Sequence, residues 1–261
     1  MTASPGSVRP LALITGATAG LGRVFADRLA RRGHDLLLVA RDGDRLAAVA
    51  RELAELGVSV EVLEADLAQD DDVSRVAERI RAGRPLSVLV NNAGFGTTGR
   101  LSETPIEPQV AMLHLHALAP MRLIQAALPG MLARRSGSVI NVSSVAAFLF
   151  SPGSINYCAT KAYLTVFSEG LAAELAGSGV RVQALCPGFT HTEFHQRMGM
   201  DPAALKRRRP WLTSDYVVDT SLAAMDRGSP VVCIPSIRYK LIVTLLRLIP
   251  RSLLGYLLRR R

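Results

Sequence analysis

The sequence has few cysteines, and its three, Cys158, Cys186 and Cys233, lie far apart in the chain. This count and spacing exclude a disulfide framework and a CxxC metal site, and they are typical of a protein in a reducing compartment. The first ten residues also lack the apolar segment of a secretory signal. We therefore expect a cytoplasmic protein.

Long uncharged apolar runs are absent as well. Arg238, Lys240, Arg247 and Arg251 interrupt the apolar C-terminal segment, so it offers no run of about 20 residues that could span a bilayer. Glycine and proline, 21 and 14 of 261 residues, are not enriched, and 49% of the residues are hydrophobic. This composition excludes a disordered chain and predicts a folded domain with a substantial core.

Acidic residues end at Asp226, and the formal net charge of +9 comes largely from the C-terminal residues beyond it. Seven of the 31 lysines and arginines lie in the last 26 residues, so residues 1–235 hold 24 basic and 22 acidic residues. A further basic run occupies 206–209. No nucleic-acid partner is expected, because the basic stripe lacks interleaved aromatic residues and no nucleic-acid-binding module accompanies it.

The tail, 236–261, has the pattern of a basic amphipathic helix. Lys240, Thr244, Arg247 and Arg251 share one helical face, and Pro250 is expected to divide the helix in two. A basic stripe on an apolar helix suits peripheral contact with an anionic membrane. The alternative is a helix packed on its own domain or on a neighbouring subunit.

Apolar, β-branched segments alternate with helical segments through the rest of the chain. The expected strands are 11–15, 35–40, 58–65, 86–90, 138–142, 180–185 and 231–234, and the expected helices are 21–32, 44–56, 71–82, 107–134 and 156–176. This order predicts an α/β fold, a Rossmann-type doubly wound parallel sheet of about seven strands in a single domain, 1–235. The long polar connection 189–214 fits a lid over a binding site.

The first expected strand runs into a glycine-rich turn, 16–22, where a helix opens. Glycines at such a turn let backbone amides approach a pyrophosphate, with the positive end of the helix behind them. A second pattern, 94–99, matches GxGxxG literally, but Pro105 and Pro108 come after it in place of a helix, so we do not expect it to bind phosphate.

The second expected strand ends in Ala40-Arg41, where an acidic residue would bind the ribose hydroxyls of NAD. A guanidinium suits a 2′-phosphate by its charge and its bidentate geometry. We therefore expect NADP rather than NAD, with Arg23 as a second candidate for the phosphate.

Tyr157 and Lys161 are four residues apart on an expected helix and share a face. A phenol has a pKa of about 10, and a nearby ammonium lowers that pKa, as a general acid–base requires. Ser144, at the end of the fifth strand, is placed to hold a substrate oxygen beside the phenol. The pair alone also fits an ordinary amphipathic helix, but it occurs together with the glycine turn and with Asn91-Asn92-Ala93-Gly94 after the fourth strand.

With these motifs, the chain resembles the short-chain dehydrogenase/reductase family, in its single-domain branch, over about residues 10–235. The resemblance implies hydride transfer between NAD(P) and a carbonyl or alcohol carbon. It implies that Tyr157 donates or accepts the proton, that Lys161 lowers the pKa of Tyr157 and binds the nicotinamide ribose, and that Ser144 orients the substrate oxygen. Because dimers and tetramers are usual in this family, a homodimer or homotetramer is expected.

The implied cofactor-binding residues lie in the glycine turn and after successive strands. They are Gly16, Thr18, Gly20, Leu21, Gly22, Arg41, Asp66, Leu67, Asn92, Ala93, Gly94, Tyr157, Lys161, Pro187, Gly188 and Thr192. Asp66 would contact the adenine, 92–94 would line the cofactor floor, and Pro187-Gly188 would fix the nicotinamide carboxamide.

One position departs from the family pattern. The family usually has an asparagine in the long helix that supports a water-linked proton relay from the lysine, and His116 stands there in this chain. Since imidazole can also hold a water, His116 is a catalytic candidate. The alternative is a packed histidine outside the relay, and His114 is the candidate if the count is off.

The segment 189–214 contains His191, Glu193 and His195, but no other ligand cluster accompanies them, and we expect no metal. Its aromatic and methionine side chains make it apolar enough to close over an apolar substrate, or to pack on the domain. These residues are Phe189, Phe194, Met198, Met200 and Trp211.

Together these features predict an NADP-dependent oxidoreductase, either a ketone or aldehyde reductase or a secondary-alcohol dehydrogenase. The expected substrate is an apolar small molecule, lipid-like or steroid-like. The departure at His116 keeps one alternative open, a non-catalytic dinucleotide-binding regulatory or membrane-associated interaction protein.

Overall fold

The computed structural model describes residues 9–194, 211–228, 230–250 and 252. Strands and helices alternate along the chain. They are β1 (Leu11–Thr15), α1 (Gly20–Arg31), β2 (Asp35–Ala40), α2 (Gly43–Ala54), β3 (Val60–Glu64), α3 (Asp70–Ala82), β4 (Leu86–Asn91), α4 (Ile106–Leu113), η1 (His114–Leu118), α5 (Ala119–Ala133), β5 (Gly137–Val142), η2 (Val145–Phe148), α6 (Ile155–Glu174), β6 (Val180–Leu185), α9 (Ser214–Asp226), β7 (Val232–Cys233) and α10 (Ile237–Leu248).

The seven strands form one parallel sheet in the order β3-β2-β1-β4-β5-β6-β7. β1 lies between β2 and β4, with Leu13 opposite Leu37 on one side and Leu89 on the other. All five residues of β1 are buried, as a strand covered on both faces requires. The predicted doubly wound α/β fold is confirmed, although β7 is shorter than the segment 231–234 expected for it.

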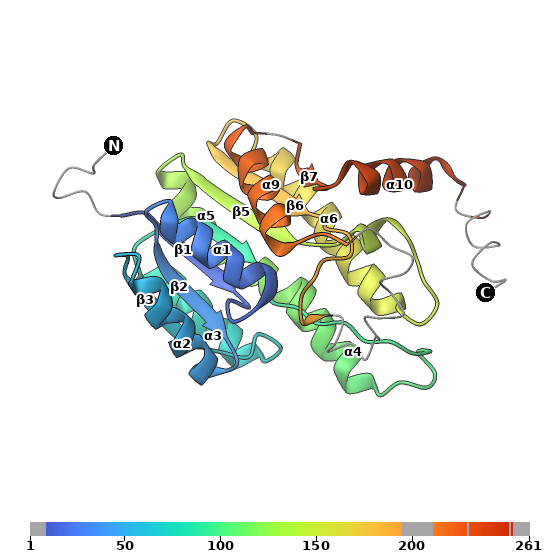
Figure 1. Ribbon diagram of the computed structural model, residues 1–261, viewed down its shortest axis with the longest axis horizontal. Helices are drawn as coiled ribbons and strands as arrows, with labels where there is room; N and C mark the ends of the chain where they lie inside the picture. The colour runs from blue at the N-terminus through green and yellow to red at the C-terminus, as the bar shows by residue number, and fades with distance from the viewer. Residues whose placement is uncertain (1–8, 195–210, 229, 251, 253–261) are drawn as a thin grey trace.

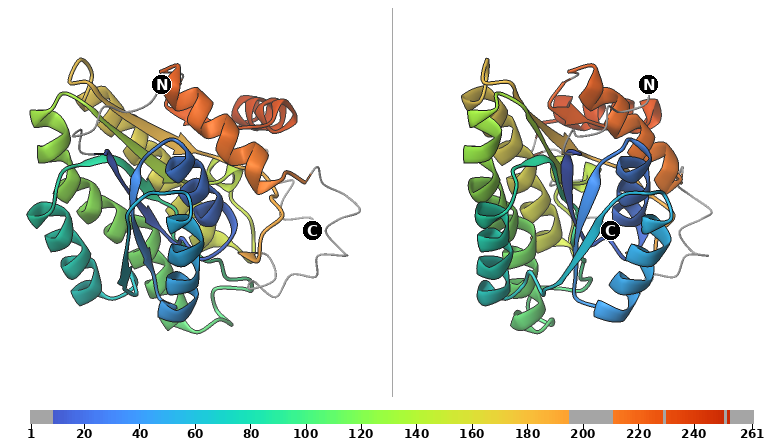
Figure 2. Two further views of the ribbon diagram at one scale, coloured as in Figure 1. Left: turned by 60° about the vertical axis from the view of Figure 1, so that its left-hand side comes forward. Right: turned by 90° about the vertical axis from the view of Figure 1, so that its left-hand side faces the viewer.

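Helices cover both faces of the sheet (Figures 1 and 2). One face packs on α1, α2 and α9 through a cluster that includes Ile14, Phe25 and Leu222. The other packs on α3, α5 and α6 through Leu13, Leu123 and Leu171. Because successive residues of β1 enter opposite clusters, the sheet has a core on each side.

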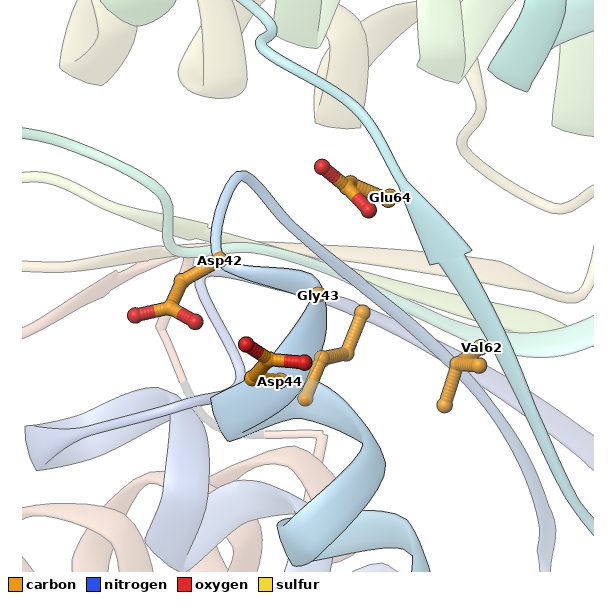
Figure 3. Close-up of a pocket in the computed structure, with 6 residues that line it drawn as sticks. Asp42, Gly43, Asp44, Val62 and Glu64 are labelled. Atoms are coloured by element: carbon orange, nitrogen blue, oxygen red, sulfur yellow. The ribbon is translucent and has the colours of Figure 1, made fainter.

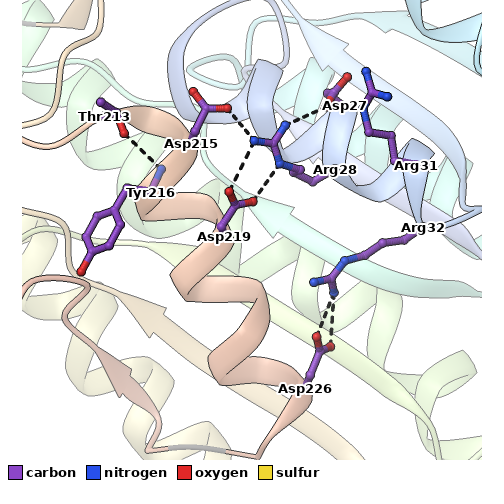
Figure 4. A network of polar contacts seen from close by, with 9 residues as sticks. All are labelled: Asp27, Arg28, Arg31, Arg32, Thr213, Asp215, Tyr216, Asp219 and Asp226. Carbon is purple, nitrogen blue, oxygen red and sulfur yellow. Dashed lines mark hydrogen bonds and ion pairs between the residues drawn. The ribbon is translucent and has the colours of Figure 1, made fainter.

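Ion pairs tie α1 to α9 on the first of these faces (Figure 4). The guanidinium of Arg28 contacts Asp215 at 2.6 Å, Asp219 at 2.8 Å and Asp27 at 2.9 Å. Arg32 pairs with Asp226 at 3.1 Å. These contacts fix the helix that comes after the segment 189–214 against the first helix of the fold.

The long helix expected over 107–134 is not one regular α-helix. It consists of α4, the π-helical segment η1 and α5, and the amide of Ala119 reaches back five residues to the carbonyl of His114. Pro120 has no N–H to donate to the carbonyl of His116, which removes one ordinary α-helical bond at this point. The wide turn brings His116 into the buried interior.

The C-terminal helix α10 ends at Leu248, just before Pro250. The second helix that is expected after the proline lies outside the described residues. No helix in the described part of the chain is long and apolar enough to cross a membrane.

Candidate active site

The carboxyl ends of β1, β4, β5 and β6 meet at one edge of the sheet. The strand order reverses between β1 and β4, because β2 continues on one side of β1 and β5 on the other side of β4. In open α/β sheets ligands bind in the crevice at such a switch point. The predicted site residues lie in the segments that leave these strands.

The glycine turn after β1 has a backbone that only glycine adopts easily. Gly16 and Gly20 have φ angles of 66° and 54°. A Cβ on Gly16 would lie 2.9 Å from the Cα of Ala93, and one on Gly22 would overlap the carbonyl of Gly16. The first turn of α1 holds no acidic side chain, and no side chain caps its amides. These features fit a dinucleotide pyrophosphate.

β1 and β4 are fastened together beside this turn. The hydroxyl of Thr15 accepts hydrogen bonds from the amides of Asn92 and Ala93, both at 2.9 Å. The side-chain amide of Asn92 donates to the carbonyl of Thr15 at 2.9 Å. This clamp fixes 92–94 as one wall of the crevice, and Gly94 at its end is exposed.

The adenine-side candidates after β3 have different surroundings. Asp66 accepts a hydrogen bond from the amide of Ala68 at 3.1 Å, and its own amide donates to Asp72 at 2.6 Å. The side chain of Leu67 is buried in the core. A ligand would therefore meet Leu67 through its backbone.

Tyr157, Ser144 and Lys161 come together at the ends of β5 and α6. Ser144 lies close enough to the hydroxyl of Tyr157 to lower its pKa as a hydrogen-bond partner. The ammonium of Lys161 is buried, donates to the carbonyl of Val142 at 2.9 Å, and lies 5.8 Å from the centroid of the Tyr157 ring. The helix periodicity of the YxxxK motif thus places both side chains on one face of α6, toward β5.

Burial determines the pKa of Tyr157 in the chain alone. It raises that pKa to about 12, and the hydrogen bond with Ser144 offsets only part of the effect. Burial also lowers the pKa of Lys161 to about 8. The lowering of the tyrosine pKa that is expected from Lys161 stays a prediction. Tyr157 is protonated at neutral pH.

His116 lies beside Tyr157, with ring centroids 5.9 Å apart. His114 points elsewhere, with its Nδ1 3.8 Å from Asp70. The Nδ1 atom of His116 is 3.0 Å from the hydroxyl of Thr160, whereas its Nε2 is buried and hydrogen-bonded to no described residue. Burial, and then the charge of Lys161, hold the pKa of His116 well below its usual range, so the imidazole is neutral.

Gly94 separates His116 from Lys161. A Cβ on Gly94 would lie 2.8 Å from the Nε2 of His116 and 3.7 Å from the Nζ of Lys161. Both nitrogens therefore border the same small space behind the crevice wall. Any side chain at position 94 would fill that space.

A buried polar network that the sequence analysis missed supports these groups. Ser143 donates to the carbonyl of Lys161 at 2.8 Å and also contacts Thr165. Asn91 donates to Asn141 at 2.8 Å across β4 and β5. Buried polar residues within otherwise apolar strands and on a helix were the only sequence signal for this network.

Three arginines lie near the end of β2. Arg23 pairs with Glu52 at 2.7 Å, and Arg45 pairs with Glu193 at 3.0 Å. Arg41 is exposed and has no ion pair with any described residue. Only Arg41 of the three is therefore free for a 2′-phosphate without breaking an existing pair.

An acidic depression of about 300 Å³ adjoins Arg41 between α2 and β3 (Figure 3). Asp42, Asp44 and Glu64 are among its lining residues. Asp42 also caps α2 by accepting from the amide of Arg45 at 3.0 Å. Negative charge beside Arg41 weakens the attraction that this arginine exerts on a phosphate.

The segment after β6 closes the crevice from the opposite side. Pro187 is buried, and Gly188 is packed so tightly on the ring of Tyr239 that a Cβ there would overlap it. Thr192 abuts the glycine turn, since a Cβ on Gly20 would lie 3.1 Å from its Cγ2. Phe194 lies 5.8 Å from Tyr157, ring centroid to ring centroid.

The rest of the expected lid is described only in part. His191 stacks on Trp211 at 4.7 Å, and Trp211 also contacts Phe189 at 5.6 Å. His195, Met198, Met200 and the basic run 206–209 lie outside the described residues. Among the residues that are described, no cluster of three or more His, Cys, Asp or Glu side chains could hold a metal ion.

Relatives with this arrangement are known. The family model for short chain dehydrogenases matches residues 10–202. A short-chain dehydrogenase from Sphingobium yanoikuyae, solved with NADPH, is 37% identical over 93% of this chain and 97% of its own, with a TM-score of 0.83. A bulky-bulky ketone specific alcohol dehydrogenase from Comamonas testosteroni is 33% identical over 94% and 97%, with a TM-score of 0.79.

A third solved structure carries the other nicotinamide cofactor. It is a short chain dehydrogenase/reductase from Burkholderia phymatum in complex with NAD, 25% identical over 91% of this chain and 92% of its own, with a TM-score of 0.81. The matched region includes the glycine turn and the Tyr157–Lys161 pair of this chain. The chain therefore belongs to the short-chain dehydrogenase/reductase family and is an oxidoreductase that acts on CH–OH or C=O groups.

Proposed function

We propose that this protein is an NADP-dependent reductase of bulky apolar ketones, or the dehydrogenase of the corresponding secondary alcohols. The observation that carries the proposal is the meeting of Tyr157, Lys161 and Ser144 at the ends of β5 and α6, with the Nζ of Lys161 5.8 Å from the centroid of the Tyr157 ring. The raised pKa of Tyr157, about 12, keeps its hydroxyl protonated at neutral pH. A protonated phenol there is the state that gives a proton to a ketone oxygen.

Different residues of this chain bind the cofactor, hold the substrate and transfer the proton. The turn 16–22 and the wall 92–94 hold the dinucleotide, and Pro187-Gly188 positions its nicotinamide end. Ser144 holds the substrate oxygen beside Tyr157, and Lys161 binds the nicotinamide ribose. A bound nicotinamide supplies or accepts the hydride.

His116 supports the return of the proton to Tyr157. Its Nε2 borders the same space as the ammonium of Lys161, on the inner side of Gly94. A neutral imidazole nitrogen there accepts a hydrogen bond from a water or from the ammonium of Lys161. In relatives with asparagine at this position, an amide oxygen accepts the corresponding hydrogen bond. His116 thus acts in the relay rather than on the substrate.

The preference for NADP rests on Arg41. Its guanidinium is exposed at the end of β2 and has no competing ion pair with a described residue. The Sphingobium relative was solved with NADPH, which supports the same choice. The carboxylates of Asp42, Asp44 and Glu64 limit the preference by their opposing charge.

The apolar character of the substrate is inferred from the side chains around Tyr157. Phe194 flanks its ring, and Phe95 lies 6.3 Å from the imidazole of His116. The Comamonas relative, named for bulky-bulky ketones, supports a substrate with large groups on both sides of the carbonyl. Aromatic walls with few polar groups favour such a ketone over a charged one.

The test is the oxidation of NADPH and of NADH with a panel of ketones that carry two bulky apolar substituents. We expect turnover with NADPH, and a loss of about 100-fold to 10,000-fold in kcat for Tyr157→Phe with cofactor binding retained. Undiminished turnover by Tyr157→Phe would contradict the mechanism. Cofactor binding without turnover of any ketone or alcohol would favour the non-catalytic alternative.

We also propose a homodimer or homotetramer in a reducing, cytoplasmic environment. Exposed apolar side chains gather on the outer faces of α4 and α6, with Val110 49%, Tyr163 40% and Val166 67% exposed. A partner subunit would remove this surface from water. The three cysteines are buried and unpaired, which suits a reducing compartment. Light scattering of the purified protein measures the assembly.

A further inference from the structure

The helix α10 has one face seated on the domain. Tyr239 and Val243 are 5% and 2% exposed and join a small core with η2 and Phe189. The hydroxyl of Tyr239 accepts a hydrogen bond from the amide of Phe189 at 3.1 Å. The guanidinium of Arg247 lies 4.6 Å from the ring centroid of Phe148. The helix is thus part of the folded domain and has a fixed orientation.

The opposite face of α10 is a row of exposed aliphatic side chains. Its members are Ile237, Leu241, Leu245 and Leu248, which are 67%, 59%, 61% and 75% exposed. Their spacing of four, four and three residues places them on one stripe of the helix. Inward packing therefore accounts for only part of the apolar pattern of the tail, because these four side chains turn away from the domain.

Basic side chains border the exposed row. Arg238 lies on one side of it, and Lys240 and Arg247 lie on the other, all three exposed. No acidic residue occurs anywhere in the sequence after Asp226, so nothing in the tail neutralises this charge. An apolar stripe flanked by uncompensated positive charge is complementary to a surface that is apolar beneath and negative at its edge.

This charge also selects among possible occupants of the row. A second copy of the chain would bring the same basic side chains together, and like charges oppose such a contact. A bilayer with anionic headgroups offers phosphates to the arginines and an acyl layer to the leucines. It satisfies both parts of the surface at once.

We propose that the outward face of α10, defined by Ile237, Leu241, Leu245 and Leu248 with Arg238, Lys240 and Arg247, docks the protein on an anionic lipid bilayer. Figure 1 shows the helix on the side of the molecule opposite β3. The contact is peripheral, with the helix parallel to the membrane plane. This contact does not cover the crevice, because the crevice lies on the domain side of Tyr239 and Gly188.

Flotation of the full-length protein tests the proposal. The probe is a set of vesicles made of equal parts phosphatidylglycerol and phosphatidylcholine, compared with phosphatidylcholine alone. We expect the wild type to float with the anionic vesicles at low salt and not with the neutral ones. Leu241→Gln with Leu245→Gln should weaken binding by about tenfold or more, and Arg238→Gln with Lys240→Gln by about fivefold per charge removed.

Matched variants elsewhere separate this surface from general effects of hydrophobicity and charge. Leu56→Gln with Leu132→Gln removes two exposed leucines outside α10, and Arg51→Gln with Arg100→Gln removes the same charge. Both should float like the wild type, and all variants should keep their ketone reductase activity in solution. Because flotation needs no catalysis, the result is independent of the proposed reaction.

Two results would overturn the proposal. The first is a wild type that does not float with anionic vesicles at low salt; a change of oligomeric mass in the Leu241/Leu245 variant would then assign the row to a second copy of the chain. The second is a Leu241/Leu245 variant that floats as well as its control.

Discussion

The imidazole of His116 and the hydroxyl of Thr160 form a buried contact, Nδ1 to Oγ1, of 3.0 Å. The same hydroxyl donates to the carbonyl of Tyr157 at 3.1 Å, so its single proton is already used. Thr160 must then accept the Nδ1 proton of His116. This leaves a lone pair on the buried Nε2, which faces the space shared with Lys161.

The first prediction concerns this nitrogen. His116→Ala should lower kcat by about tenfold to 100-fold with little change in KM, because the substrate crevice stays intact while the relay loses an acceptor. His116→Asn should recover most of kcat, since an amide oxygen also accepts. Steady-state kinetics across the pH range measures both.

Gly94 provides the matched control for that prediction. Gly94→Ala should lower kcat in the wild-type background, because the new Cβ would lie 2.8 Å from the Nε2 of His116. It should lower kcat less in the His116→Ala background, where the ring is gone. If His116→Asn were as slow as His116→Ala, the histidine would serve packing alone.

The second prediction concerns cofactor choice. Arg41→Ala should raise the KM for NADPH by about tenfold or more, because a charge-assisted hydrogen bond to the 2′-phosphate is lost. The KM for NADH should not change. Arg51→Ala, an exposed arginine on α2, is the control. An equal effect of Arg41→Ala on both cofactors would assign this arginine a role unrelated to the phosphate.

The third prediction concerns pH and stability. Burial lowers the pKa of Lys161 from 10.5 to about 8, so between these values the unfolded chain holds a proton that the folded chain does not. The free energy of unfolding of the wild type should therefore rise with pH in this window, relative to Lys161→Met, by about 1.4 kcal/mol per pH unit at most. Urea denaturation at a series of pH values measures it. Parallel pH profiles for the two proteins would show that Lys161 keeps an ordinary pKa.

The fourth prediction concerns the contact between α1 and α9. Arg28 joins three carboxylates there (Figure 4), and its pKa is raised, first by the hydrogen bond with Asp219. Arg28→Ala should lower the free energy of unfolding by about 1–2 kcal/mol, because a network of charge-assisted bonds is worth more than one surface pair. Arg31→Ala, which removes a single exposed pair with Asp27, should cost less than about 0.5 kcal/mol. High salt should reduce the difference between the losses in free energy of unfolding of the two variants. Equal losses for Arg28→Ala and Arg31→Ala at low salt would contradict the stabilising role of the network.

The sheet was predictable because its strands are nearly continuous apolar runs of the right length. β1, β2 and β6 have the residues expected for them, since glycines or turn residues bound these segments clearly. The ends of β3 and β7 were not predictable to the residue, because a strand ends where pairing with its neighbour ends. That depends on the partner's position in the sheet, which local sequence does not encode.

The surroundings of Tyr157 were less predictable than its place on α6. The YxxxK spacing is local, and it puts Tyr157 and Lys161 on one face of a helix. The pKa of each depends on everything packed around it, and burial raises the pKa of Tyr157 and lowers that of Lys161. The partners of His116 depend in the same way on the π-helical turn at η1, which no periodic pattern in the sequence marks.

The basic tail shows the same division. The sequence alone determined that acidic residues stop at Asp226, and it predicted an apolar helix with basic residues before Pro250, because charge and helical periodicity are properties of local order. It also determined the strand–helix alternation and the chemistry of its motifs. Only the tertiary structure decided that Tyr239 and Val243 face the domain while Leu241 and Leu245 face outward. That orientation depends on the hydrophobic surface that η2 and Phe189 offer for α10 to cover.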